Sequence, residues 1–581
     1  MKKKTDVFYA LLFGLLMLFL FLSVVQRQTG LFKTTALNGV VNTTEAPVLD
    51  YEGFCTGRYQ MQLEKHMSEN YGFRGITIKL YNQYLWDFYR KTYAPEVVAG
   101  KHNWLFYPQS VNDYYGTEMY RWQDSAEEAK ATYEREVKNM VKLRTILEPY
   151  GIDFMMFMAP EKGFVYSEYL PARTKDTTSI NARVFFDEKL AEVGFPYIEM
   201  TKWFLQMKDT CNYLLLPQTG AHWDFASVYA ADSLFRYMES LKGIELPRLS
   251  YSRQTEDMSE LQKTNRDLEW SLNLLRKIHW KQEVMPAAKV DIVADTAMVK
   301  PRVLFIGNSF LWRINDYIPL DNVFDSPEFW YYYSTAYSAP GFSVSKDVMG
   351  LDLLEKLFEF DYIVWFTTGN QMYKACYGFV ENALIALCVE DSVRERVCNH
   401  LMDSLKNDAV MSEKYVDLLQ GDTVQYYWKL RGEVRNLLIK DPEKYFPEIR
   451  DENFMSARNS RVEKQLVIRR ISRSEEWMSS LRCQMVIHNT TLARILSEEA
   501  DNVLLGRPLY RDEKNIHRKK SYFEDQVKRV MEEIKGKPEL LRQIEEKAVT
   551  KGITVEESLE RDARWIVSDK INRGLIVLPE E

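Results

Sequence analysis

Ser309 is the first residue whose type and position could carry chemistry. It stands in the motif Gly-Asn-Ser-Phe (307–310), directly after the apolar run 303–306. A serine at a strand-to-helix turn projects above the sheet, and the N–H groups of the turn can face an oxyanion. Such turns are common and most are structural, so this motif alone leaves both a nucleophile and a structural turn open.

His222 is the second such residue. It lies in the motif Thr-Gly-Ala-His-Trp-Asp (219–224), which precedes an alanine-rich helical segment at 226–231. A histidine beside a helix start could act as the general base for a serine. The alternative is a histidine that stacks on Trp223 in the core.

Two further polar sites follow apolar runs. Glu161 and Lys162 come after the run 152–158, where a helix-capping loop with a surface ion pair is the simpler interpretation. Asn370 comes after the run 362–366. Its amide could donate to an oxyanion, or it could satisfy its own backbone in a loop.

Three apolar runs, 152–158, 303–306 and 362–366, must position these side chains. Each run is continuous rather than alternating, which is typical of buried parallel strands in an α/β sheet. Ligands of such sheets bind beyond the carboxyl ends of the strands. We therefore expect the site at the segments that follow the three runs.

The motifs occur together and in order, and with them the chain resembles the alginate O-acetyltransferase family of the AlgJ/AlgX type, which has an SGNH-hydrolase-like domain. The resemblance covers about 71–387 and implies a parallel sheet flanked by helices, with circularly permuted motif order. The matching stretches are VVAGKHNWLFY (97–107), FMAPEKGFVYSEYLP (157–171), TGAHWDFASVYA (219–230) and VLFIGNSF (303–310), and WFTTGNQMYKACYGF (365–379) resembles a later strand and loop of some members.

The resemblance also implies roles, and the sequence departs from the family in two places. Ser309 falls on the nucleophile and His222 on the general base. The family usually has an Asp two residues before the histidine, where this chain has Gly220, and Asn308 stands where an acid is common. A histidine without a carboxylate behind it lacks a fixed tautomer. Asp224 is the candidate orienting acid, and a Ser–His dyad without an acid stays open.

The favoured function is a membrane-anchored O-acetyltransferase that acts on an exported cell-surface polysaccharide. Ser309, deprotonated by His222, would accept the acetyl group and pass it to a sugar hydroxyl. The amides at Asn308 and Ser309, with Asn370, would hold the oxyanion. Acetyl-CoA is cytoplasmic, so the resemblance implies a membrane-bound O-acyltransferase partner that supplies the acetyl group. No dissociable cofactor and no metal are predicted.

Two alternatives stay open. The same site could belong to a carbohydrate acetylesterase that passes the acetyl group to water. The missing Asp at position 220 and the helical tail favour, in part, a non-catalytic glycan-binding or scaffold subunit of an acetylation complex.

The N-terminal segment predicts membrane attachment. Lys2–Lys4 precede the uncharged run Val7–Val25, which is nearly long enough to span a bilayer core of about 30 Å. The lysines favour the cytoplasmic side, so the rest of the chain should lie on the periplasmic or extracytoplasmic face of the inner membrane. No small-x-small cleavage site follows, which favours a retained signal-anchor (1–27) over a cleaved signal peptide.

The rest of the chain divides into three predicted parts. A linker and N-terminal helical segment (28–94) precede the SGNH-hydrolase-like domain (95–387), whose polar insert at about 250–300 could be a lid or a surface helix. A helical C-terminal domain (388–581) follows. Within it, a shift of 63 residues aligns about 464–504 with about 527–567 at mostly apolar positions, as in duplicated helical units.

Composition excludes other classes of protein. With 76 Lys+Arg, 83 Asp+Glu and a net charge of −7, the chain is no general nucleic-acid binder. A mean hydropathy of −0.36 excludes a polytopic membrane protein. The six cysteines demand no disulfide, and none has metal-ligand spacing with a histidine. Trp104, Trp223 and Trp365 are expected in the core or site wall, whereas Tyr331–Tyr333 are better candidates for sugar contact.

Overall fold

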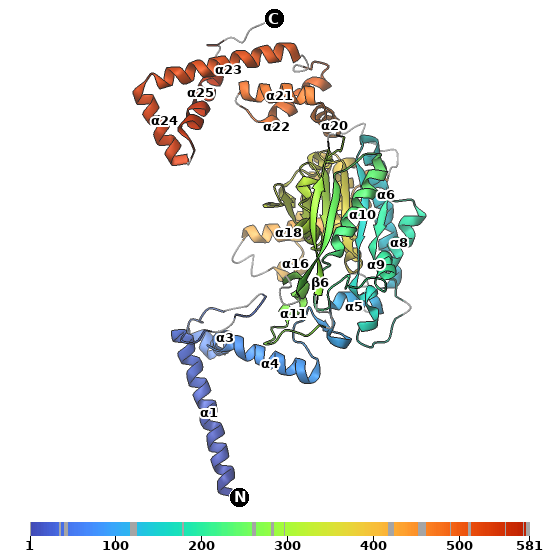
Figure 1. The fold of residues 1–581 in the computed structure, drawn as a ribbon, viewed down its shortest axis with the longest axis vertical. Helices are drawn as coiled ribbons and strands as arrows, with labels where there is room; N and C mark the ends of the chain where they lie inside the picture. Colours follow the sequence, from blue (N-terminus) through green and yellow to red (C-terminus); the bar gives the residue numbers. More distant parts are fainter. Residues whose placement is uncertain are drawn as a thin grey trace. The chain divides into compact units, whose positions relative to one another are not determined.

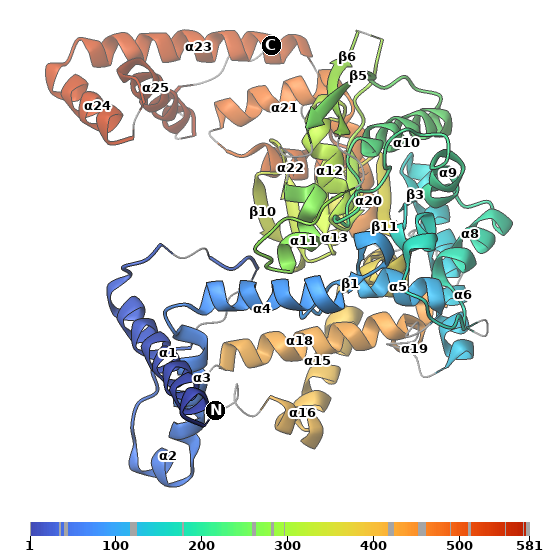
Figure 2. The same ribbon diagram turned by 60° about the horizontal axis from the view of Figure 1, so that its bottom comes forward.

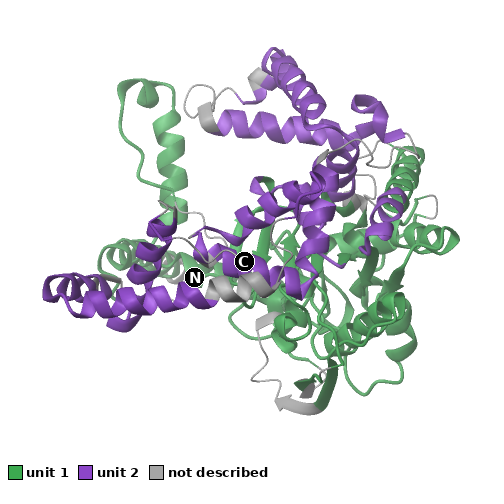
Figure 3. Cartoon of the chain, turned by 90° about the horizontal axis from the view of Figure 1, so that it is seen from above, with its two compact units in different colours: residues 1–141, 153–349, 362–377 green, residues 142–152, 350–361, 378–581 purple. Residues whose placement is uncertain are grey.

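The computed structural model describes two compact units that interleave along the chain (Figure 3). Unit 1 comprises residues 1–141, 153–349 and 362–377, and unit 2 comprises 142–152, 350–361 and 378–581. The predicted domain boundaries at 27, 94 and 387 stay predictions. The described residues are all except 1, 34–35, 40–43, 117–124, 177–178, 258–262, 281–283, 296, 416–422, 451–459, 489, 509–512, 552, 573–574 and 577–581.

A seven-stranded sheet forms the centre of unit 1 (Figure 1), with the strand order β10-β9-β8-β7-β11-β3-β4. Five adjacent strands, β8, β7, β11, β3 and β4, are parallel to one another, and β9 and β10 are antiparallel additions at one edge. This confirms the predicted α/β class with a mostly parallel sheet. The strands are β3 (Asp153–Ala159), β4 (Tyr197–Glu199), β7 (Val303–Gly307), β8 (Glu328–Tyr331), β9 (Thr335–Ser338), β10 (Val344–Asp347) and β11 (Tyr362–Thr368).

The three predicted strands are β3, β7 and β11, which are neighbours in the sheet. Every residue of β7 and β11 is buried, as are all residues of β3 except the first. Strands covered on both faces cannot alternate apolar with polar residues, which explains their continuous apolar runs. Because β7, β11 and β3 are adjacent and parallel, the segments that follow them meet at one edge of the sheet.

Helices cover both faces of the sheet. One face shares a core with α10 (Ala226–Lys242) and α12 (Phe310–Tyr317). On the other face, Trp365 of β11 meets Phe186 of α8 (Ala182–Glu192), and Phe186 meets Tyr133 of α6 (Ala126–Leu147). The remaining α-helices of unit 1 are α1 (Lys2–Thr29), α2 (Tyr51–Cys55), α3 (Arg58–Asn70), α4 (Arg74–Tyr89), α5 (Pro108–Tyr115), α7 (Lys162–Val165), α9 (Met200–Met207) and α11 (Asp267–Ser271).

Two small antiparallel sheets complete unit 1. β1 (Val98–Ala99) pairs with β2 (Leu105–Phe106) within the first matching stretch. β5 (Arg248–Asp257) pairs with β6 (Val284–Val293). The polar insert at about 250–300 is therefore mostly a β-hairpin that carries the short helix α11, rather than a lid or a surface helix alone.

The N-terminal helix α1 contains one segment, Val7–Thr29, that is long and apolar enough to cross a membrane by length and composition. A membrane anchor and a signal sequence both meet this description.

Unit 2 is helical over its C-terminal part, as predicted. Helix boundaries within the predicted repeat recur at the same shift of 63 residues. Helices α20 and α23 end at Ser472 and Lys535, and helices α22 and α25 begin at Leu492 and Val555. This recurrence supports the duplication, which stays a prediction. The α-helices are α13 (Leu353–Leu357), α14 (Phe379–Cys388), α15 (Asp391–Lys406), α16 (Ala409–Lys414), α18 (Thr423–Lys440), α19 (Pro442–Tyr445), α20 (Ser460–Ser472), α21 (Glu475–Ile487), α22 (Leu492–Leu504), α23 (Glu513–Lys535), α24 (Pro538–Lys551) and α25 (Val555–Asn572).

Candidate active site

Ser309 lies at the turn between the central strand β7 and helix α12. The strand ends at Gly307 and the helix begins at Phe310, so Ser309 is the helix N-cap. The first N–H groups of a helix have no partner within the helix. Ser309 therefore combines an accessible hydroxyl with a position at a positive helix end, where negative charge is stabilised.

A hydrogen-bonded chain joins Ser309, His222 and Asp267. The Oγ atom of Ser309 lies 2.7 Å from Nε2 of His222, and Nδ1 of His222 lies 2.5 Å from Oδ2 of Asp267. A carboxylate can only accept a hydrogen bond, so Nδ1 carries the ring proton and Nε2 is left to accept from the serine hydroxyl. The side chains of His222 and Asp267 are 17% and 24% exposed, so a substrate can reach them.

Asp267 opens helix α11 and is held in a fixed orientation. Its Oδ1 atom accepts from the N–H groups of Ala221 and Leu268, both at 2.8 Å. The Asp267 carboxylate thus links the loop that carries His222 to helix α11. Two hydrogen bonds to one oxygen leave the other oxygen directed at the histidine ring.

Gly220 explains why the acid is absent from its usual family position. A Cβ atom at Gly220 would lie 2.7 Å from the backbone oxygen of Asn265 and 2.8 Å from its carbonyl carbon. No side chain fits there without moving that backbone. The segment that excludes a side chain at position 220 is the same segment that brings Asp267 to His222.

Asp224 has another role, which corrects the prediction that it orients His222. It is buried and accepts hydrogen bonds from Arg313, Tyr317 and Asn265. We call these four residues the Asp224 cluster. Its geometry satisfies the carboxylate fully, and the position behind the histidine ring is taken by Asp267.

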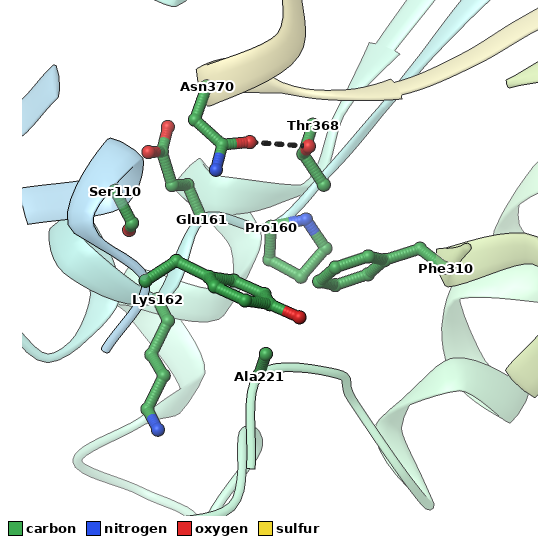
Figure 4. Close-up of a pocket in the computed structure, with 9 residues that line it drawn as sticks. Ser110, Pro160, Glu161, Lys162, Ala221, Phe310, Thr368 and Asn370 are labelled. Carbon is green, nitrogen blue, oxygen red and sulfur yellow. Dashed lines mark hydrogen bonds between the residues drawn. The ribbon is translucent and has the colours of Figure 1, made fainter. Parts of the chain in front are cut away.

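The two predicted oxyanion residues, Asn308 and Asn370, differ in whether their N–H groups already have a hydrogen-bond partner. The backbone N–H of Asn308 donates to the Phe366 carbonyl at 3.3 Å, and its side chain donates to Thr368 at 2.9 Å. The Asn308 backbone amide is thus already engaged, which corrects its predicted role. Thr368 in turn donates to Oδ1 of Asn370 at 2.7 Å, and the amide nitrogen of Asn370 points away from Thr368 (Figure 4).

Lys162 is buried and not part of a surface ion pair. Its Nζ atom donates to the carbonyls of Leu105, Gln218 and Gly220 at 2.7, 3.0 and 2.7 Å. Three donors meet three acceptors, so the ammonium group is satisfied without a hydrogen-bonded carboxylate. Burial lowers the pKa of Lys162 well below its usual value, and the nearby charge of Asp267 opposes this shift. Lys162 thereby links the loop that carries His222 to β2 through these hydrogen bonds.

Glu161 is buried as well, next to the carboxyl of Asp113. Burial, followed by the charge of Asp113, raises the pKa of Glu161 well above its usual range. Burial also raises the pKa of Asp113. Two carboxyls this close cannot both ionise in a buried site, so the pair holds a proton.

A cavity of about 30 Å³ adjoins the triad (Figure 4). Ala221 and Phe310, the chain neighbours of His222 and Ser309, form part of its wall. Glu161, Lys162 and Asn370 line it from the ends of β3 and β11. A space of this size holds a water molecule or a methyl group.

The three predicted core tryptophans, Trp104, Trp223 and Trp365, are all buried. Tyr331 and Tyr332 are partly exposed, whereas Tyr333 is buried and is not available for sugar contact. The rings of Tyr331 and Tyr332 lie 4.3 Å apart, and the N–H of Tyr332 donates to the Gly307 carbonyl at 2.8 Å. These rings therefore stand near the serine turn.

Sequence reasoning missed Asp267 and the buried role of Lys162. The acid lies far from His222 in the sequence, in a charged insert that has the composition of a surface segment. One signal was present: Asp267 begins a short, partly apolar stretch between the two motifs, as an acid in the first turn of a helix would. Among the described residues, no group of three His, Cys, Asp or Glu side chains could hold a metal ion.

Comparison with known proteins agrees with this geometry. Residues 97–315 match the family model described as "SGNH hydrolase-like domain, acetyltransferase AlgX". The matched range contains Ser309, His222 and Asp267. No curated protein sequence matches the chain.

Three solved structures are similar over about half of the chain. The O-acetyltransferase domain of Pseudomonas putida AlgJ is 14% identical, with a TM-score of 0.31, over 48% of this chain and 93% of its own. Pseudomonas aeruginosa AlgX is 13% identical, with a TM-score of 0.31, over 49% and 67%. Bacillus cereus PatB1 is 10% identical, with a TM-score of 0.30, over 48% and 96%.

At these scores the three structures carry no argument of their own, and the assignment depends on the family model. That match confirms the resemblance read from the motifs. Residues 97–315 are therefore similar to the SGNH hydrolase-like acetyltransferase domains of the AlgX type.

Proposed function

We propose that this protein is a membrane-anchored O-acetyltransferase that acetylates an exported cell-surface polysaccharide through an acyl-enzyme at Ser309. The observation that carries the proposal is the hydrogen-bonded chain from Ser309 through His222 to Asp267. The acid behind the histidine removes the main reason for a non-catalytic scaffold, which was the missing Asp at position 220.

The first half of the reaction acylates the enzyme. The Ser309 Oγ attacks the acetyl carbonyl of the donor while its proton moves to Nε2 of His222. The Asp267 carboxylate stabilises the imidazolium that forms. As the intermediate collapses, the bond from the carbonyl carbon to the donor oxygen breaks, and His222 returns the proton to the leaving oxygen.

The second half transfers the acetyl group. A sugar hydroxyl attacks the acetyl-serine carbonyl and gives its proton to His222. The bond to Ser309 Oγ then breaks, and the serine recovers that proton. In both halves, the N–H of Ser309 and the amide nitrogen of Asn370 are the proposed donors to the oxyanion.

Two features of the site support this choice of substrates. The 30 Å³ cavity next to the triad has room for the methyl of an acetyl group. The partly exposed rings of Tyr331 and Tyr332 offer flat apolar surface for the face of a sugar. The donor would come from a membrane-bound O-acyltransferase partner, because acetyl-CoA stays in the cytoplasm.

The proposal is tested with full-length protein, 4-nitrophenyl acetate and an oligosaccharide acceptor. We expect mass spectrometry to find one acetyl group on Ser309, and the acceptor to become acetylated. Ser309→Ala should abolish both signals, whereas Ser345→Ala, at an exposed serine of β10, should leave both unchanged.

The other outcomes separate the alternatives. Free acetate without acetylated acceptor, across a panel of surface polysaccharides, would assign the site to an acetylesterase. The absence of acetyl-Ser309 with a folded protein would support a scaffold.

A further inference from the structure

Helix α4 has two unlike faces. One face is buried: Gln83 accepts from the N–H groups of Leu275 and Arg276 at 3.1 and 3.0 Å, and Trp86 packs with Leu268 and Leu272. This face fastens α4 to the segment that begins at Asp267, and thus to the candidate active site.

The other face of α4 is apolar, aromatic and exposed. Tyr81, Tyr84 and Phe88 follow one another at helical spacing and are 51%, 47% and 74% exposed. Leu80 and Tyr93 extend the patch, and the rings of Tyr81 and Tyr93 stack at 5.7 Å. A continuous exposed apolar patch of this kind marks an interaction surface.

The beginning of α4 is built against the end of α1, within unit 1. Phe73, the N-cap of α4, stacks on Phe19 of the apolar span at 6.0 Å and meets Phe32 at 5.9 Å. A Cβ atom on Gly72 would lie 2.4 Å from the Ser23 carbonyl oxygen, so only glycine permits this approach. Figures 1 and 2 both show α3 and α4 beside the end of α1.

Polar side chains close the same junction. Gln26 exchanges two hydrogen bonds with the backbone of Phe32, both at 2.7 Å, and Arg27 lies 2.7 Å from the His66 ring. The end of α1 therefore has specific partners in the segment that follows it. A signal sequence that is removed needs no such partners, so the junction favours a retained helix.

We propose that the exposed face of α4 lies in the membrane–water interface at the point where α1 leaves the bilayer. The occupant of the patch is lipid. Three observations favour it. The helix that carries the patch begins next to Phe73, which stacks on the membrane-spanning helix, and the patch is rich in tyrosine, which concentrates at bilayer interfaces. Arg90 and Lys91 follow α4, as suits anionic headgroups.

This inference rests on the proposed anchoring and extends it from α1 to the catalytic unit. A helix that lies in the interface, fastened to the Asp267 segment, holds the site at a set height above the bilayer. That placement suits an acetyl group delivered by a partner within the membrane.

The test places a nitroxide at position 84 or 88 of the full-length chain in nanodiscs of phosphatidylcholine and phosphatidylglycerol. Tyr84→Cys and Phe88→Cys are labelled separately, with Cys55, Cys211 and Cys398 replaced by serine, so that one misfolded variant leaves the other to decide. Val193→Cys, an exposed apolar position after α8, is the matched control.

We expect oxygen to relax the labels at 84 and 88 more strongly than a water-soluble nickel complex does, and the opposite at 193. Labels at 84 and 88 that behave like the label at 193 would place the face in water and overturn the proposal. Labels shielded from both reagents would show a protein partner in place of lipid. Acetyl-Ser309 formation by the same samples reports separately on the proposed function.

Discussion

The triad and the Asp224 cluster are built from the same three chain segments. His222 and Asp224 share one segment, Asp267 and Asn265 share the second, and Ser309 and Arg313 share the third. The two clusters differ in exposure, because Asp224, Asn265 and Arg313 are almost fully buried while the triad can be reached from solvent.

This difference separates two tasks. The buried cluster pairs the Asp224 carboxylate with the Arg313 guanidinium, so it fixes where the three segments lie. The triad keeps a serine hydroxyl and a histidine ring available to exchange a proton with substrate. Changes in the triad should therefore affect rate, and changes in the cluster should affect stability.

Asp267→Asn should have the largest effect, and this effect should be confined to the rate of acetyl-enzyme formation. An amide in this position can donate to Nδ1, which leaves Nε2 protonated and unable to accept the serine proton. We expect acetyl-enzyme formation to slow by about 10⁴-fold, with a Tm close to that of the native protein. Stopped-flow acylation and thermal unfolding measure the two quantities.

A second substitution sharpens this prediction. Gly220→Asp should not restore the rate of Asp267→Asn, since a side chain at 220 meets the Asn265 backbone. Recovery of the rate in the double variant would contradict our account of position 220.

Arg313→Met should have the next largest effect, on stability. It leaves the Asp224 carboxylate buried without its cation, at a cost of about 3–5 kcal/mol in the free energy of unfolding. The acylation rate per folded molecule should change by less than about tenfold, which is about 1.4 kcal/mol. Urea denaturation with active-site titration separates the two.

The matched control is the double variant Asp224→Asn/Arg313→Met, which removes both charges. It should recover part of the lost stability, because a neutral pair has less to satisfy. A double variant that loses the sum of both single effects would show that the ion pair does not link these segments.

Lys162→Met should have a smaller effect on both quantities. The substitution removes the hydrogen bond to the Gly220 carbonyl and leaves buried acceptors unpaired, which should lower the free energy of unfolding by about 1–3 kcal/mol. It also makes the loop that carries His222 less rigid. Lys346→Met, at an exposed lysine of β10, is the control and should be neutral. Unchanged stability and rate in Lys162→Met would contradict the role assigned to this ammonium group.

Glu161→Gln should change only the pH dependence of stability. The native pKa of Glu161 is raised, so the folded chain keeps a proton that the unfolded chain releases above its ordinary value of 4.5. Stability is then fully present below that pH and falls as pH rises toward the folded pKa, by up to about 1.4 kcal/mol per pH unit. Glutamine should flatten this fall in urea titrations at several pH values.

Much of the fold was accessible from the sequence, because its main signals are local. The continuous apolar runs 152–158, 303–306 and 362–366 are buried parallel strands, so the segments that follow them meet at one edge of the sheet. Ser309 and His222 stand at the ends of regular elements, where spacing and residue type are informative.

The parts that sequence could not reveal depend on contacts between distant segments. Asp267 becomes an orienting acid only because the Asn265 backbone fills the space at Gly220. Lys162 looks like a surface lysine until the carbonyls of Leu105, Gln218 and Gly220 converge on it. Asn308 loses its predicted role because the sheet already uses its N–H.

The separation of Asp267 and His222 along the chain affects how proteins with similar motifs should be classified. A motif with Asp two residues before His identifies a catalytic acid only when both residues share a loop. In this chain a glycine at that place coincides with an acid supplied by a different segment. Relatives with the same glycine should be judged inactive only if the insert between their His and Ser motifs also lacks an acid. In this chain the acid and the histidine come from two segments, so neither segment alone identifies the pair.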